Sequence, residues 1–116
     1  MSALLDAQCT FAEDVSLFIQ ECKRLGYRVK LGEVLRPPEM QTIYMRQGKS
    51  WAPNSRHLSA LALDFQLFRG DKYLTDEEEY AGPGLFWESL RPENSWGASS
   101  GRPRKDAGHV ERERPK

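Results

Sequence analysis

The chain contains two histidines, and each lies close to a carboxylate in the sequence. His57 precedes Asp64 by seven residues, and Asp106 precedes His109 by three. Two imidazoles and one carboxylate are a common ligand set for catalytic zinc, with a fourth position left for water. Isolated histidines are more often surface or hydrogen-bonded structural groups, so these four residues alone leave both interpretations open.

Asp64 lies within a segment, residues 60–68, whose pattern predicts a β-strand. Bulky apolar residues alternate there with small or polar ones, so that a core would receive Leu61, Leu63, Phe65 and Leu67, and the opposite face would carry Ala62, Asp64 and Gln66. His57 ends the preceding loop, and a turn would bring it and Asp64 to one metal, with His109 as a remote third ligand. A turn entering a strand at His109 would place Asp106 beside the metal as a general base.

Other patterns predict the elements around these residues. Residues 11–25 have a helical period, with Thr10 and Glu13 at capping-box spacing and Gly26 as the stop. The remaining expectations are a strand over 27–31 continuing toward Leu35, a helix from Pro38 to about Gly48, a loop over 49–56, a short strand over 72–74, an irregular segment over 75–90 whose helix is interrupted by Gly82-Pro83-Gly84, a final strand over 108–111, and a frayed tail over 112–116.

Composition limits the class of protein. A chain of 116 residues is about the size of one compact domain, so we expect a single domain over 1–116 and a monomer. The 17 basic and 17 acidic residues cancel, which removes any global attraction for nucleic acid or an anionic membrane. The N-terminus has no signal-peptide pattern and no stretch has the length of a membrane span, so we expect cytoplasmic synthesis without membrane insertion.

Three motifs together resemble a known family. The segment SRHLSALALD, residues 55–64, is similar to the SxHxxGxAxD signature of zinc peptidases that include D-Ala-D-Ala carboxypeptidases, vancomycin-resistance dipeptidases and phage L-alanyl-D-glutamate endopeptidases. The Trp-Gly element of that family resembles Trp96-Gly97, and its late carboxylate-xx-His motif resembles Asp106 to His109, in the same order. The aspartate at position 106 and the short chain resemble the phage endolysin branch.

The resemblance implies a fold and a set of roles. The fold would be α+β, a small antiparallel sheet flanked by helices, like that of D-Ala-D-Ala carboxypeptidases and hedgehog domains. Zinc would be held by His57, Asp64 and His109, with Asp106 as catalytic base, and Arg36 would hold the substrate carbonyl or the oxyanion. Ser55 and Gln41 are candidate hydrogen-bonding groups around these residues. The sequence departs from the family at Ala60, where the HxxG motif has glycine.

The resemblance also implies a function and leaves alternatives. The first hypothesis is a phage endolysin that hydrolyses the L-Ala to D-Glu amide in the peptide stem of peptidoglycan and reaches the wall after release across the inner membrane through a companion pore. A D,D-carboxypeptidase or dipeptidase would use the same chemistry on a different bond. A third hypothesis is a non-catalytic, zinc-stabilised module that binds cell wall or nucleic acid through Arg102, Arg104, Lys105, Arg112, Arg114 and Lys116.

Overall fold

The computed structural model describes residues 2–34, 38–48, 56–99 and 101–116. Its elements, in chain order, are α1 (Ala3–Arg24), β1 (Arg28–Leu31), α2 (Pro38–Arg46), the 3-10 helix η1 (Arg56–Ser59), β2 (Ala62–Arg69), β3 (Lys72–Tyr73), α3 (Glu77–Leu90), β4 (Asn94–Trp96) and β5 (His109–Arg112). The strands form one antiparallel sheet in the order β1-β2-β5-β4, and β3 pairs with β2. The predicted α+β fold with an antiparallel sheet and helices is therefore confirmed.

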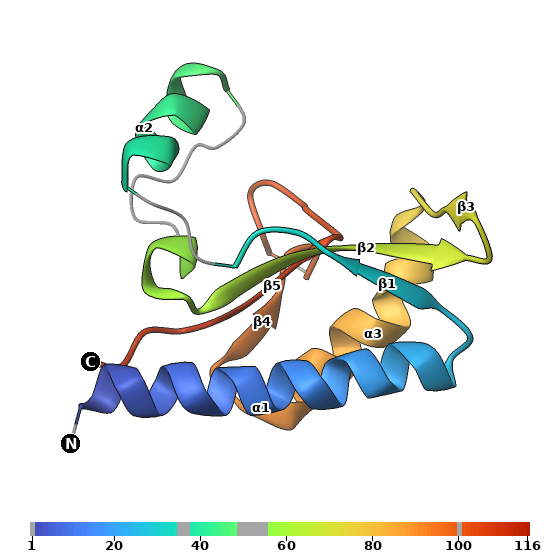
Figure 1. The fold of residues 1–116 in the computed structure, drawn as a ribbon, viewed down its shortest axis with the longest axis horizontal. Helices are drawn as coiled ribbons and strands as arrows, with labels where there is room; N and C mark the ends of the chain where they lie inside the picture. The colour runs from blue at the N-terminus through green and yellow to red at the C-terminus, as the bar shows by residue number, and fades with distance from the viewer. Residues whose placement is uncertain (1, 35–37, 49–55, 100) are drawn as a thin grey trace.

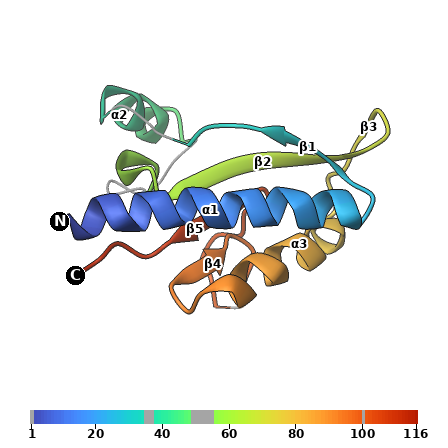
Figure 2. The ribbon, with the colours of Figure 1, turned by 60° about the horizontal axis from the view of Figure 1, so that its bottom comes forward.

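The core lies between one face of this sheet and the two long helices, α1 and α3 (Figures 1 and 2). Alternate residues of the β2 segment point into it, and Leu61, Leu63, Phe65 and Leu67 are all buried, as their pattern predicts. Phe65 packs edge-on against Phe18 of α1, with ring centroids 4.9 Å apart, and contacts Tyr80 of α3 at 5.6 Å. The opposite face of β2 is therefore free to carry Asp64 and Gln66.

Helix α1 is longer at its start than the sequence pattern predicts. It begins at Ala3, and the Ser2 hydroxyl caps it by accepting a hydrogen bond from the Leu5 backbone N–H at 3.2 Å. The capping-box prediction for Thr10 was wrong, because its hydroxyl lies inside the helix and donates to the Asp6 carbonyl at 3.0 Å. Alanine and leucine in the first turn favour the helical extension. Among the described helices, none is long and apolar enough to cross a membrane.

Helix α3 is continuous through Gly82-Pro83-Gly84, so the predicted interruption was wrong. The reason is packing. Gly84 has no side chain, so α3 can approach β4 closely, whereas a Cβ atom at this position would lie 2.3 Å from the Trp96 ring. The Tyr80 hydroxyl accepts a hydrogen bond from the Leu67 N–H and donates to the Leu74 carbonyl. These buried contacts hold the helix on both sides of its proline.

The C-terminal strand extends one residue beyond its predicted end. Arg112, which we placed at the start of a frayed tail, is the last residue of β5 and is only 3% exposed. Its guanidinium pairs with the buried Asp14 of α1, and its Nε donates to Asn94 at 3.1 Å. This buried pair ties the end of β5 to the first helix. Strand β4, which includes Asn94, lies in a polar stretch for which no strand was predicted.

Candidate metal centre

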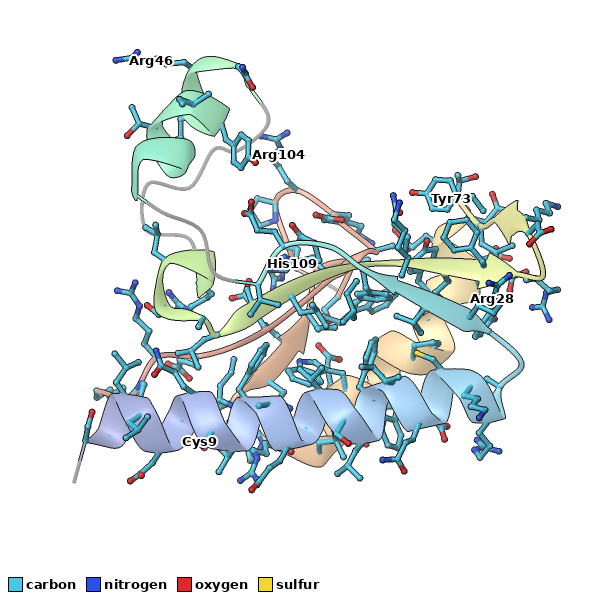
Figure 3. The ribbon with its side chains drawn as sticks, in the orientation of Figure 1. Cys9, Arg28, Arg46, Tyr73, Arg104 and His109 are labelled. Atoms are coloured by element: carbon cyan, nitrogen blue, oxygen red, sulfur yellow. The ribbon has the colours of Figure 1, made fainter. Side chains whose placement is uncertain are left out.

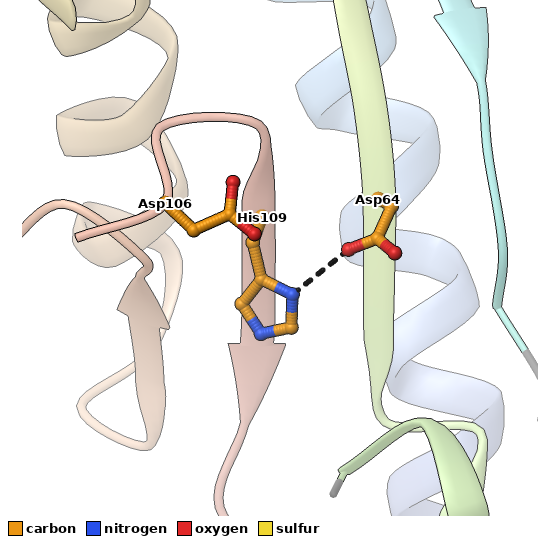
Figure 4. Close-up of side chains that lie close together, drawn as sticks. All are labelled: Asp64, Asp106 and His109. Carbon is orange, nitrogen blue, oxygen red and sulfur yellow. Dashed lines mark hydrogen bonds and ion pairs between the residues drawn. The ribbon is translucent and has the colours of Figure 1, made fainter. Parts of the chain in front are cut away.

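Asp64 and His109 lie directly opposite each other on neighbouring strands. The register of β2 and β5 pairs them, and both side chains lie on the face of the sheet away from the core. The His109 Nδ1 atom is 3.0 Å from Asp64 Oδ1 (Figure 4). The side chains of two residues that pair directly across antiparallel strands lie on the same face of the sheet and close to each other. The strand pairing thus joins two predicted ligands that are 45 residues apart in the sequence.

A tight turn before β5 brings Asp106 to the same place. The Gly97 N–H donates to the His109 carbonyl at 2.7 Å, and the Asp106 N–H donates to the Gly97 carbonyl at 2.9 Å. A Cβ atom at Gly97 would lie 2.1 Å from the Asp106 carbonyl oxygen, so the position requires glycine. The Trp96 indole N–H donates to the Ala107 carbonyl at 2.8 Å. Trp96 and Gly97 therefore shape the turn that presents Asp106.

Among the described residues, Asp64, Asp106 and His109 form a group that could hold a metal ion, with one ligand atom from each and all three within 4.8 Å of one another. Zinc bonds of about 2.0–2.1 Å place two ligand atoms of a tetrahedral ion roughly 3.3 Å apart. The 3.0 Å between Asp64 and His109 is close to that separation. One imidazole and two carboxylates are also donors that divalent metals accept. The residues present therefore fit a metal.

His109 is held from both sides. Its Nε2 atom lies 2.7 Å from Glu111 Oε1, and its side chain is 14% exposed. Burial alone would lower the pKa of His109, but the hydrogen bonds to Asp64 and Glu111 and their negative charges outweigh it and raise the pKa to about 9. The metal-free imidazole is therefore protonated near neutral pH, and a metal that binds Nδ1 must displace that proton.

Glu111 is a site residue to which sequence reasoning gave no role. Burial opposes its charged form, but the hydrogen bond and charge of His109, with Arg102 and Arg56 nearby, lower its pKa. Arg102 Nη1 lies 3.5 Å from Glu111 Oε1, and Arg56 Nε lies 3.9 Å from Oε2. A carboxylate on Nε2 fixes the tautomer that leaves Nδ1 for a metal. The only signal for this role in the sequence was that Glu111 follows His109 by two residues, which places both side chains on one face of a strand.

A cleft of about 560 Å³ adjoins the cluster formed by Asp64, Asp106 and His109. It is lined by residues of β1, β2, β3 and the turn before β5. Tyr73, one of these residues, lies on the side of the sheet away from α1 (Figure 3). The described residues that line it are Lys30, Leu31, Gly32, Glu33, Asp64, Phe65, Gln66, Tyr73, Leu74, Thr75, Tyr80, Asp106, Ala107 and Gly108. Two of the three clustered side chains therefore face a space that can admit a ligand.

The fold is similar to that of a solved peptidase. The crystal structure of the Serratia marcescens L-Ala D-Glu endopeptidase ChiX matches 87% of this chain and 79% of its own, with a TM-score of 0.69 and 23% sequence identity. No family model and no curated protein sequence matches the chain. At this identity the likeness to ChiX establishes the fold, and the roles of individual residues rest on the geometry of the site.

The structure brings together three of the predicted site residues. Asp64, Asp106 and His109 converge, whereas Arg36 and Ser55 lie outside the described residues. The backbone of His57 belongs to η1, five residues before the first residue of β2, but its side chain lies outside the described part, as does that of Gln41. The roles of His57 and Arg36 therefore stay predictions. Within the cluster, the position of Asp106 suits either a third ligand or a base.

Ala60, which replaces the family glycine, is the only non-glycine residue with a positive φ in the described part of the chain, at 53°. This left-handed conformation costs an L-residue about 1–2 kcal/mol, whereas glycine adopts it readily but loses more chain entropy on folding. We therefore expect Ala60→Gly to raise the free energy of unfolding by about 0.5–1 kcal/mol, as measured by urea denaturation.

The matched control for this substitution is Ala62→Gly, two residues further along. Ala62 is buried in β2, so glycine there should lower the free energy of unfolding. A destabilised Ala60→Gly protein would show that the backbone at this position does not carry the expected strain.

Proposed function

We propose that this protein is a zinc metallopeptidase that hydrolyses the L-Ala to D-Glu amide in the peptide stem of peptidoglycan, acting as a phage endolysin. The observation that carries the proposal is the convergence of Asp64, Asp106 and His109 at the edge of an open cleft. The similarity of the fold to an L-Ala D-Glu endopeptidase supports the substrate class. The motif order from residue 55 to residue 109 supports the choice of metal.

In this proposal each side chain has one task. His57, Asp64 and His109 would hold zinc, which would supply a Lewis acid for the scissile carbonyl and for water. Glu111 keeps the His109 ring in the orientation that turns Nδ1 toward Asp64. Arg36 would hold the carbonyl oxygen as negative charge develops on it.

Asp106 has the position of a general base. Its side chain is exposed beside the cleft, and its Oδ1 accepts a hydrogen bond from the Gly108 N–H at 3.2 Å, which orients the carboxylate. From there it would take a proton from the attacking water and pass it to the nitrogen of the leaving amine. The turn built on Gly97 holds Asp106 beside the cluster, so the proposed base is positioned next to His109 by the end of β4 and the start of β5.

The contacts of two arginines weaken the third hypothesis, a module that binds a polyanion through the basic C-terminal residues. Arg112 is buried and paired with Asp14, and Arg102 donates to Ser95 Oγ at 2.8 Å and lies beside Glu111. Two of the six basic residues invoked for such binding are thus engaged within the fold. The remaining basic residues are interrupted by acidic ones and have no interleaved aromatic residue for base stacking.

The proposal is tested by metal analysis combined with digestion of purified sacculi. We expect about one zinc per chain and release of peptides that begin with D-Glu, identified by mass spectrometry. Treatment with a chelator should abolish release, and added zinc should restore it. Products lacking only a terminal D-Ala would instead identify a D,D-carboxypeptidase, and tight zinc binding without any peptide release would contradict a catalytic function.

A further inference from the structure

Lys30, which carries a cationic side chain, lines the cleft beside the cluster of Asp64, Asp106 and His109. Lys30 on β1 pairs in register with Gln66 on β2, and both line the cleft. Asp64 lies two residues from Gln66 along β2, so Lys30 and Asp64 are diagonal neighbours across the strands, at about 7–8 Å. Between Lys30 and the cluster, Gly32 carries no side chain beside Asp64. Lys30 and two members of the cluster, Asp64 and Asp106, therefore line the same cleft.

Lys30 differs from the other charged residues nearby because its charge has no partner within the described part of the chain. On the same strand, Arg28 Nη1 is 3.1 Å from Asp71 Oδ1. Glu33, also in the cleft, accepts a hydrogen bond from the Tyr44 hydroxyl at 3.3 Å. Gln66, half-buried opposite Lys30, likewise has no side-chain hydrogen bond to the described residues. An ammonium and an amide, both able to donate, thus face one space.

We propose that Lys30 and Gln66 bind a substrate carboxylate next to the scissile amide. This inference rests on the proposed function for the identity of the substrate, in which the D-Glu residue is linked onward through its γ-carbonyl and keeps a free α-carboxylate. The two carboxylate oxygens can accept hydrogen bonds from the Lys30 ammonium and the Gln66 amide. Among the described residues that line this cleft, Lys30 is the only basic one, and the carboxylates of Glu33, Asp64 and Asp106 would repel an anion.

The test uses two peptides that differ by one charge. The first is L-Ala-γ-D-Glu-L-Lys, and the second carries an amide in place of the α-carboxylate. Both are also made with a reduced CH2–NH link between Ala and Glu, which cannot be hydrolysed. Binding of the reduced peptides to the zinc-loaded protein is measured by calorimetry, and kcat/KM is measured with the cleavable pair. We expect wild type to bind the acid roughly tenfold more tightly than the amide.

Two variants assign this preference to a residue. Lys30→Met should remove the preference for the acid, whereas Lys23→Met, which removes the same charge from the exposed end of α1, should keep it. Equal binding of acid and amide by wild type, a preference that survives in Lys30→Met, or no binding of either peptide would overturn the inference. A Lys30-dependent preference without hydrolysis of the cleavable peptides would uphold it and count against the proposed function instead.

Discussion

Replacing Asp106 by asparagine should lower kcat for peptide release by about 10²- to 10⁴-fold, the usual contribution of a general base, while zinc stays bound. Asparagine keeps the size of the side chain and can still accept the hydrogen bond from the Gly108 N–H. It cannot take a proton from water at neutral pH. The measurement pairs steady-state kinetics with metal content, because the cluster geometry suits Asp106 as a ligand or as a base.

Two further aspartates provide the comparison. Asp64→Asn changes a proposed ligand that contacts His109 directly, so it should weaken zinc binding as well as turnover. Asp71→Asn changes an exposed aspartate at the β2 to β3 turn and should leave both unchanged. If Asp106→Asn loses zinc as readily as Asp64→Asn, then Asp106 is a ligand. If it keeps full activity, the base must be another group.

The sequence predicts the strand that carries Asp64 well because a two-residue period has one structural interpretation. A strand with apolar residues at alternate positions must turn the intervening ones to its other face. The buried Leu63 and Phe65 and the half-buried Asp64 between them follow that rule. The pairing of Asp64 with His109 is different, since it depends on the register of two strands distant in sequence, which local patterns do not encode. The ligand chemistry of the histidines and aspartates suggested that they meet, and the motif resemblance supported it, but neither gives the register.

Local helix propensity does not predict the structure of segments whose conformation is determined by tertiary packing. Gly82, Pro83 and Gly84 each weaken a helix, yet α3 continues through them because Gly84 admits the Trp96 ring and Pro83 is buried. The same close packing explains the Trp-Gly motif. Gly97 is required by the carbonyl of Asp106, nine residues later, and no feature of residues 94–97 alone reveals that contact.

Glu111 and Arg112 were missed for a related reason. Glu111 is the last residue of the predicted final strand and Arg112 the first of the predicted tail, and the composition of this polar stretch gives neither charge a partner. In the fold, Glu111 lies on the site face of β5 and Arg112 on the core face, where each meets partners from distant segments. A charged residue is identified as structural or functional only when those partners are known.

Replacing Asp14 by alanine should lower the free energy of unfolding by about 3–5 kcal/mol, because it leaves a buried guanidinium without its counter-charge. Asp14 accepts hydrogen bonds from Arg112, from Arg91 Nε at 2.9 Å and from the Asn94 amide at 3.2 Å. The side chains of Asp14 and Arg112 are 5% and 4% exposed, so water cannot readily replace the lost contacts. Urea denaturation of the chelator-treated protein measures the change without a contribution from metal binding.

The control is an exposed ion pair, Arg28 and Asp71, whose side chains are 70% and 103% exposed. Arg28→Met should leave the urea midpoint almost unchanged, because solvent screens such a pair. Replacing both buried partners, as Asp14→Leu with Arg112→Met, should cost less than Asp14→Ala alone, since no unpaired charge is then buried. If Asp14→Ala is no more destabilising than Arg28→Met, the buried pair does not hold α1 to the end of β5.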